Sequence, residues 1–148
     1  MKTTSISLSD TILDKSLEKL ENDYWEKPVF QSHLVSTCHK IRKIPLKNLS
    51  VEHLRMAIGQ KMGLSYLMPL AIRALEIDPL LEAHFYEGDL LQNVLQVGDT
   101  YFDSNKNFAK AIVVACENAI RQANTRSAEF GDKVLLDLAT SFIEKYKL

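Results

Sequence analysis

Hydrophobic side chains in this chain recur at intervals of three and four residues, the spacing of one face of an α-helix. Val and Ile do not alternate with polar residues, and no Asn-Gly or Asp-Gly turn joins two apolar runs as in a β-hairpin. The pattern therefore predicts an all-α fold. We expect one domain over residues 1–148, built as an irregular bundle of about six or seven helices.

Serines mark the expected starts of the first helices, because a serine hydroxyl can accept a hydrogen bond from a free N–H of the first turn. Ser9 begins a helix that ends near Asn22, and Ser32 begins a second that Pro45 ends. Between these helices we expect an extended linker over residues 24–30, held to the core by its aromatic side chains. The apolar stripes of the two helices are Ile12-Leu13-Leu17-Leu20 and Leu34-Cys38-Ile41.

Ser50 begins the third helix, which Gly63 is expected to terminate in the left-handed conformation. Proline lacks an N–H and clashes with the preceding turn. The fourth helix should therefore start only one or two residues before Pro69, and Asp78-Pro79 should end it. The apolar positions of these two helices are Leu54-Ile58-Met62 and Leu70-Ile72-Ala74-Leu75.

Two Gly-Asp pairs and a Ser-Asn pair delimit the remaining elements. Gly88-Asp89 begins a helix that Gly98-Asp99 ends, and Ser104 or Asn105 begins a long helix that weakens over residues 125–131. The last helix runs almost to the end of the chain. The apolar positions of the last two helices are Phe108-Ala111-Ile112-Ala115-Ala119 and Leu135-Leu138-Phe142-Tyr146.

Composition narrows the class of protein. The chain has 148 residues, 46% of them hydrophobic and 25% charged, and a formal net charge of -1. These values suit one hydrophobic core and exclude intrinsic disorder, and a dedicated duplex-binding protein would be more basic. Residues 1–10 do not resemble a secretory signal, and no apolar run is long enough to span a membrane. We expect a cytoplasmic protein that exists as a monomer or weak homodimer.

Motifs for catalysis or metal binding are not evident. The sequence contains no phosphate-binding glycine loop, zinc-protease motif or nucleophile elbow. His33, Cys38 and His39 lie close together, but no second Cys/His pair completes a zinc site. Cys38 and Cys116 each read as an unreactive core thiol, and two thiols favour a reducing compartment. We therefore expect no enzyme activity, no metal and no cofactor.

Charge order is the most informative feature. Residues 74–103 contain seven acids and no Lys or Arg, whereas residues 27–61 contain seven bases and only one acid, Glu52. A solvated face with a few helix caps would explain single residues, but explains the whole acidic block less well. An acidic surface without bases can capture a basic protein or occupy a nucleic-acid groove in place of phosphates. The acids are Glu76, Asp78, Glu82, Glu87, Asp89, Asp99 and Asp103; the bases are Lys27, Lys40, Arg42, Lys43, Lys47, Arg55 and Lys61.

Two adjacent segments, residues 54–71 and 78–91, resemble the immunity proteins of bacterial contact-dependent growth inhibition (CDI) systems. The similarity extends over about residues 15–97, and its most irregular part is residues 85–91. The motif elements are Leu54-Arg55, Gly59-Gln60, Gly63-Leu64, Pro69-Leu70-Ala71, Asp78-Pro79-Leu80 and Phe85-Tyr86-Glu87-Gly88-Asp89-Leu90-Leu91.

This resemblance implies a protein that binds and neutralises the C-terminal toxin domain delivered by a neighbouring cell. We expect that toxin to be a basic nuclease, and among nucleases an RNase, with the immunity protein contacting neither nucleic acid nor membrane. Aromatic residues beside the acids are candidate anchors, although Phe85 and Phe102 are expected in the core. The expected toxin-binding residues are Glu76, Asp78, Glu82, Tyr86, Glu87 and Asp89.

Two other functions remain open on sequence grounds. A helical nucleic-acid-binding or regulatory module would use the bases of residues 27–61, although the sequence pI is about 6.4. A small hydrolase would use carboxylates around residues 78–89, but such chemistry needs two carboxyls that converge in a cleft. A neighbouring gene for a large secreted toxin would favour the immunity function over both.

Overall fold

The computed structural model describes residues 8–27, 32–125 and 133–147. Within these ranges the regular secondary-structure elements are all helices. This confirms the predicted all-α fold. The described residues form nine α-helices and one 3-10 helix, more than the six or seven expected. They are α1 (Asp10–Leu13), α2 (Leu17–Glu21), α3 (His33–Lys43), η2 (Leu46–Asn48), α4 (Val51–Gly59), α5 (Leu64–Ile77), α6 (Asp89–Leu95), α7 (Asp99–Asp103), α8 (Lys106–Thr125) and α9 (Lys133–Tyr146).

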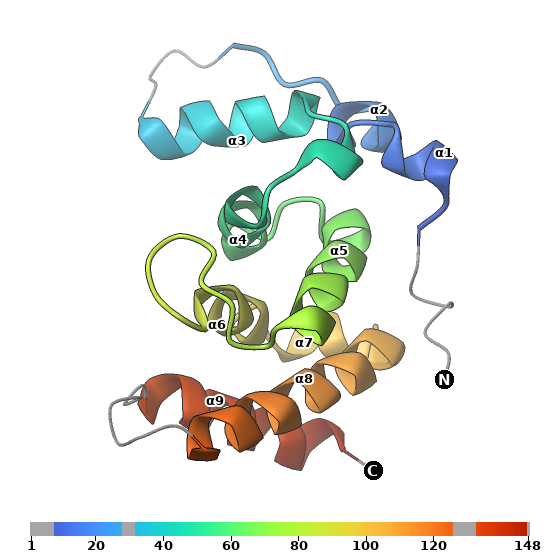
Figure 1. The fold of residues 1–148 in the computed structure, drawn as a ribbon. Coiled ribbons are helices and arrows are strands. Elements are labelled where there is room, and N and C mark those ends of the chain that lie inside the picture. Colours follow the sequence, from blue (N-terminus) through green and yellow to red (C-terminus); the bar gives the residue numbers. More distant parts are fainter. Residues whose placement is uncertain (1–7, 28–31, 126–132, 148) are drawn as a thin grey trace.

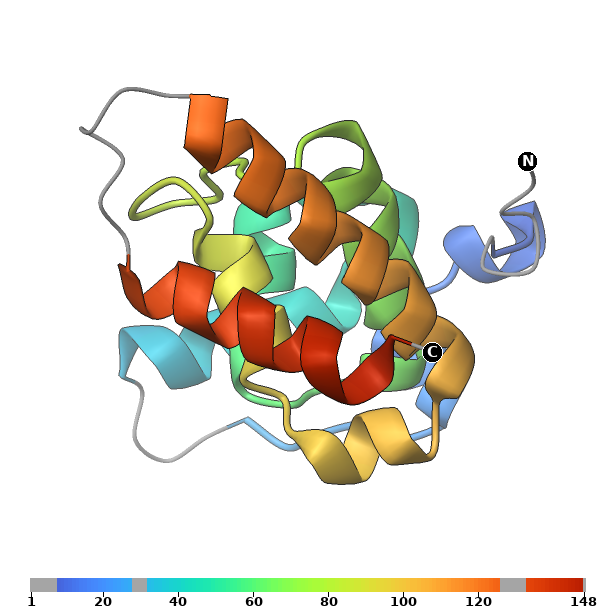
Figure 2. The ribbon, with the colours of Figure 1, turned by 90° about the horizontal axis from the view of Figure 1, so that it is seen from below.

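The helices lie in three levels (Figure 1). The N-terminal helices α1 to α3 form the upper level, α4 to α6 the middle and α8 with α9 the lower. Viewed from below, α8 and α9 lie side by side across the molecule (Figure 2). The core contains side chains from all three levels, for example Ile41, Leu91 and Ala139, none of which is exposed.

The first predicted helix is wrong as one element, because the chain turns between α1 and α2. Ser9 caps α1 as expected, its hydroxyl accepting from the Ile12 N–H at 3.3 Å. The Lys15 carbonyl instead accepts a hydrogen bond from Leu46 N–H at 3.0 Å, and Ser16 is extended. A hydrogen bond to a residue far along the chain thus replaces the helical ladder.

The other two serine caps are confirmed. The Ser32 hydroxyl accepts from the Val35 N–H at 3.1 Å at the start of α3. At the start of α4, Ser50 and His53 form a reciprocal capping box, in which His53 Nδ1 accepts from the Ser50 N–H at 3.2 Å.

The predicted start of the fourth helix is wrong. Pro69 lies inside α5, five residues after its first residue, Leu64. The proline removes only the bond to the carbonyl of Ser65, which lies in the exposed first turn where water can reach it. Gly63 is left-handed as expected, with φ 63°, but it begins α5, because α4 already ends at Gly59.

The later boundaries agree with the sequence except at one point. The helix α5 ends before Asp78, and α8 starts directly after Asn105, as predicted. The Gly98-Asp99 pair, expected to end a helix, instead begins the short helix α7. Residues 126–131, where the long helix was expected to weaken, lie outside the described residues.

Candidate functional site

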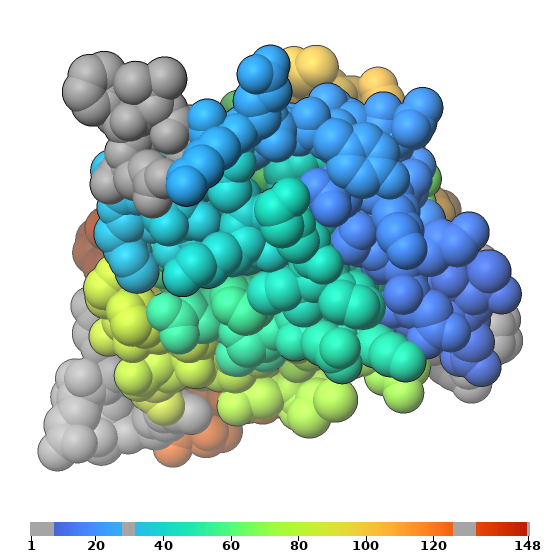
Figure 3. Space-filling model, turned by 90° about the horizontal axis from the view of Figure 1, so that it is seen from above, coloured from blue at the N-terminus to red at the C-terminus, as the bar shows by residue number. Residues whose placement is uncertain are grey.

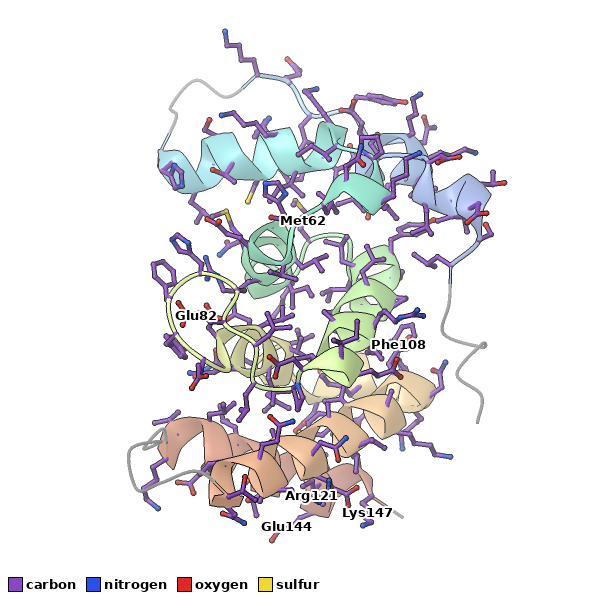
Figure 4. The ribbon with its side chains drawn as sticks, viewed as in Figure 1. Met62, Glu82, Phe108, Arg121, Glu144 and Lys147 are labelled. Carbon is purple, nitrogen blue, oxygen red and sulfur yellow. The ribbon has the colours of Figure 1, made fainter. Side chains whose placement is uncertain are left out.

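The residues predicted to contact a partner lie at the end of α5, on the following loop (residues 78–88, here the α5–α6 loop) and at the start of α6. From above, this loop forms an edge of the molecule beside α4 and the start of α3 (Figure 3). Five of the six are exposed, namely Glu76, Asp78, Glu82, Tyr86 and Glu87, and Figure 4 shows Glu82 on the loop.

Asp89 differs from the other five because it is only 2% exposed. Its carboxylate accepts backbone N–H groups from the loop: Ala83 at 2.7 Å, His84 at 3.0 Å and Phe85 at 2.8 Å. Asp89 therefore closes the α5–α6 loop. It does not cap α6, because Gly88 occupies the cap position.

These hydrogen bonds set the charge state of Asp89. Burial by itself would raise its pKa, because a buried carboxylate loses its water. The backbone N–H groups of residues 83–86 stabilise the charged form and outweigh burial, so the pKa of Asp89 lies below its ordinary value. The loop is thus closed around a carboxylate anion.

Arg55 of α4 lies beneath the loop. Its guanidinium is 4.6 Å from the centre of the Phe85 ring, and its Nε is 3.8 Å from Asp89 Oδ2. A second link joins His84 Nδ1 to Glu52 Oε2 of α4 at 3.2 Å. The loop is therefore attached to α4 through side chains, and the Tyr86 hydroxyl adds a bond to Gln92 Oε1 at 2.9 Å.

The helices behind the loop approach closely at two glycines. The amide of Asn93 in α6 donates to the Arg55 carbonyl at 2.8 Å, beside Gly59, where a Cβ would crowd the same amide. Gly88 has φ 86° and abuts Leu135 of α9. A Cβ at either position would force the neighbouring side chain to move, and Gly88 also has a left-handed backbone that side chains disfavour.

The other two acids of the block are used within the fold. Lys145 Nζ lies 2.6 Å from Asp99 Oδ2, and the Tyr146 hydroxyl donates to Asp103 Oδ1 at 3.0 Å. The hydrogen bond from Lys145 lowers the pKa of Asp99. These contacts attach α7 to α9, which leaves the exposed carboxylates of the block at the end of α5 and on the loop.

Most of the basic segment is neutralised internally. Four of its seven bases pair with carboxylates: Arg42 with Glu21, Lys43 with Glu18, Lys47 with Asp14 and Arg55 with Asp89. Three of these four carboxylates belong to the N-terminal residues 14–21. More than half of the bases that a nucleic-acid-binding module would use are therefore compensated by carboxylates of the same chain.

A pocket of about 440 Å³, which the sequence did not predict, lies between the N-terminal segment and α3–α4. Arg42, which lines the pocket and is 2% exposed, donates to Glu21 Oε1 at 2.7 Å and to the Asp23 carbonyl at 2.6 Å. Trp25 stacks on this guanidinium at 4.4 Å. Trp25, a large aromatic in a segment without helical pattern, is the one residue that could have pointed to the pocket. The lining residues are Glu21, Asp23, Trp25, Leu34, Val35, Cys38, His39, Arg42, Gln60, Lys61, Met62 and Gly63.

The predicted linker is without helix over residues 23–27, whereas residues 28–30 lie outside the described ranges. Its aromatics were expected to anchor it. Tyr24 is 57% and Trp25 40% exposed, and Trp25 contacts the body of the protein through Arg42 and His39.

Of the two phenylalanines predicted to lie in the core, one is buried and the other is exposed. Phe102 is 1% exposed and belongs to the core as expected, where it packs against Phe142. The core assignment of Phe85 is wrong, because this ring is 64% exposed. Tyr101 is half-buried, its hydroxyl donates to the Leu64 carbonyl at 3.4 Å, and burial raises its pKa to about 12.

Cys38 and Cys116 are both buried, and neither forms a disulfide. Burial raises the pKa of Cys38, and burial with the nearby charge of Glu117 raises that of Cys116 to about 12. Within the described ranges, no three His, Cys, Asp or Glu side chains gather in a way that could hold a metal ion. In the same ranges no helix is both long and apolar enough to cross a membrane.

A comparison with protein families matches residues 19–112, well over half of the chain, to the family of CDI immunity proteins. The chain belongs to this family. As a CDI immunity protein it neutralises a CDI toxin. No curated protein and no solved structure matches it significantly.

Several residues of the motif that resembles the family hold the α5–α6 loop of this CDI immunity protein in place. Arg55, Gly88 and Asp89 all hold the α5–α6 loop against α4 and α9, and Gly59 admits the amide of Asn93. Glu82 and Glu87, which lie opposite each other across an isolated β-bridge, belong to the exposed part of the same loop.

Proposed function

We propose that this CDI immunity protein neutralises a nuclease toxin, an RNase, by covering the basic substrate groove with an acidic surface. The acidic surface consists of Glu76, Asp78, Glu82, Tyr86 and Glu87. Inhibition takes place in the cytoplasm of the protected cell, where the substrate RNA is. Asp89 is not part of this surface; it holds the loop that carries most of it.

The observation that carries the proposal is that three acids of this surface have no internal compensation among the described residues. Among the described residues, Glu76, Asp78 and Glu82 lie within ion-pair distance of no basic group. Asp99 and Asp103, by contrast, are bonded to α9. Neighbouring exposed carboxylates repel each other because all of them are negative. A cluster of carboxylates without basic partners therefore favours binding of a positively charged partner.

A nuclease groove offers the matching chemistry. Its substrate is a polyanion, and such grooves are lined with Lys and Arg that bind phosphates. Carboxylates placed over those bases would exclude the substrate. Complementary charge also accelerates association, which is useful for an inhibitor that must act before the toxin turns over substrate.

The test is charge reversal on the loop with a matched control elsewhere. The variant Glu82→Lys/Glu87→Lys and the control Glu26→Lys/Glu144→Lys change the net charge equally. All four residues are exposed, and Glu144 lies on α9, at the opposite end of Figure 4 from α3. Association rates with the cognate toxin domain are measured at low and high salt, and melting temperatures verify folding.

We expect the loop variant to associate about tenfold more slowly at low salt and the difference to shrink at high salt, because salt screens exposed charges. The control should associate like the wild type. Unchanged association of a folded loop variant at low salt would refute the acidic surface. Inhibition of RNA cleavage by the toxin domain tests the RNase assignment separately, and binding of labelled RNA by the immunity protein alone would favour the nucleic-acid-binding alternative.

A further inference from the structure

We propose that Phe85 is the anchor of the toxin interface and that Arg55 and Asp89 hold its ring in the binding position before the toxin arrives. This inference rests on the proposed function and names its central contact. The partner site is an apolar pocket rimmed by basic side chains, as a nuclease uses to stack a base of its substrate.

The exposure of Phe85 is the first observation. Its ring is 64% exposed, while the core phenylalanines Phe102 and Phe142 are 1% and 7% exposed. An aromatic ring left in water forgoes the free energy of burial, about 25 cal/mol per Å² of apolar surface. Binding to a partner recovers that free energy, which is why buried aromatic anchors dominate many interfaces.

The second observation is that this exposed ring is fixed from several sides. The backbone N–H of Phe85 donates to Asp89 Oδ2 at 2.8 Å. The central carbon of the Arg55 guanidinium lies 4.6 Å from the centre of the ring. The centres of the His84 and Phe85 rings are 4.3 Å apart, with an angle of 69° between the ring planes. A side chain already ordered in the free protein loses less conformational entropy on binding than a mobile one.

Arg55 is in turn placed by the groups around it, the Asp89 carboxylate and the Phe85 ring. Its side chain is 13% exposed, and its buried Nε has no hydrogen-bond partner among the described residues. The groups placed against it are the Asp89 carboxylate, at 3.8 Å, and the Phe85 ring. A planar guanidinium can lie flat on a ring and a lysine ammonium cannot, so Arg55 acts as a positioning residue.

The flanking charges define the partner. Glu82 and Glu87 face each other across the β-bridge and enclose residues 83–86, so that Phe85 projects from between two carboxylate-bearing positions. An apolar pocket with a purely apolar rim would not match this arrangement. A pocket rimmed by Lys or Arg would, with the ring in the place of a base and the carboxylates in the place of phosphates.

The experiment measures binding kinetics of the cognate toxin domain with the full chain. The variants are Phe85→Ala, Arg55→Lys and their combination, with Tyr24→Ala as the matched control, because Tyr24 is a 57% exposed aromatic outside the loop. Phe85→Ala should weaken binding roughly 30-fold through faster dissociation, the scale of a hot spot. The factor should not depend on salt, unlike that of the loop charge reversal.

Arg55→Lys should raise the dissociation rate several-fold in the wild-type background and leave it unchanged in Phe85→Ala, because a lysine keeps the positive charge beside Asp89 and loses only the stacking on the ring. Equal effects in both backgrounds would overturn its positioning role. If Phe85→Ala binds like the wild type while Glu82→Lys/Glu87→Lys binds slowly, the anchor is wrong and the proposed function stands. If neither variant affects binding, the proposed surface itself is wrong.

Self-association is the competing use of an exposed ring. Sedimentation of the wild type and of Phe85→Ala, each without toxin, separates the two cases. We expect both to be monomeric at the concentrations of the binding assay. A wild-type dimer that Phe85→Ala dissociates, together with unchanged toxin binding, would assign Phe85 to self-association and overturn the proposal.

Discussion

Gly88 at the start of α6 abuts Leu135 near the start of α9, so the α5–α6 loop rests on the C-terminal helix. A Cβ at Gly88 would collide with the end of the Leu135 side chain. The same glycine has φ 86°, which side chains disfavour. The candidate interface therefore depends on a helix that the family match, ending at residue 112, does not include.

Gly88→Ala should lower the free energy of unfolding by about 2 kcal/mol, through left-handed backbone strain and overpacking. For a chain of this length the melting temperature should fall by roughly 4–8 °C. Thermal unfolding followed by circular dichroism measures this. In Gly88→Ala/Leu135→Ala part of the steric cost should disappear, so the two losses should sum to more than the loss of the double variant. Strict additivity would show that the contact is unimportant.

Arg42 should be the most sensitive charged residue of the N-terminal half, because it is buried and bonds α3 to Glu21 and Asp23. Arg42→Ala leaves the Asp23 carbonyl and Glu21 without their donor and removes the stacking on Trp25. We expect a loss of about 2–3 kcal/mol in urea unfolding. The control Lys43→Ala breaks an exposed pair and should cost under about 1 kcal/mol. Equal losses would contradict this account.

The sequence predicted the fold class and most helix ends because caps and stops act locally. Ser32, Ser50 and Asp78 form hydrogen bonds within a few residues of themselves, so their neighbours in the sequence suffice. The break between α1 and α2 was not predictable in this way. It depends on the bond from Leu46 to Lys15, and a single sequence does not show which distant residue will supply such a partner.

The candidate site was predicted in part for the same reason. Counting charges located the acidic block, but did not reveal that Asp89 is buried or that Asp99 pairs with Lys145. Phe85 was expected in the core from its residue type alone. Its exposure follows from how Asp89 and Arg55 fold the loop, which involves α4, more than twenty residues earlier in the chain.

Cys116 should not react with a maleimide probe at pH 8 while the protein is folded. The thiol is fully buried and its pKa is raised to about 12, so almost none of the reactive thiolate is present. Cys38 is 7% exposed and borders the Trp25 pocket, so it should react first, though slowly. Mass spectrometry of the labelled protein distinguishes the sites, and labelling in urea gives the unfolded rate. Rapid native labelling of Cys116 in Cys38→Ala would contradict its burial.

Asp89 makes the free energy of unfolding, and the conformation of the α5–α6 loop, dependent on pH. Because its folded pKa lies below the unfolded value of about 4, its contribution is complete above that value. The contribution is lost as the pH falls through the folded pKa, when the carboxylate protonates and can no longer accept all of the loop N–H groups. Asp89→Asn removes the charged acceptor at every pH.

We therefore expect Asp89→Asn to be less stable than the wild type by about 2 kcal/mol in urea unfolding between pH 5 and 8. The difference should shrink below pH 4, because the wild type then loses the same interaction. Glu144→Gln, which changes an exposed carboxylate on α9, should follow the wild-type profile. A stability gap that stayed constant down to pH 2 would mean that the Asp89 charge does not hold the loop, and that the packing of α6 alone sets its form.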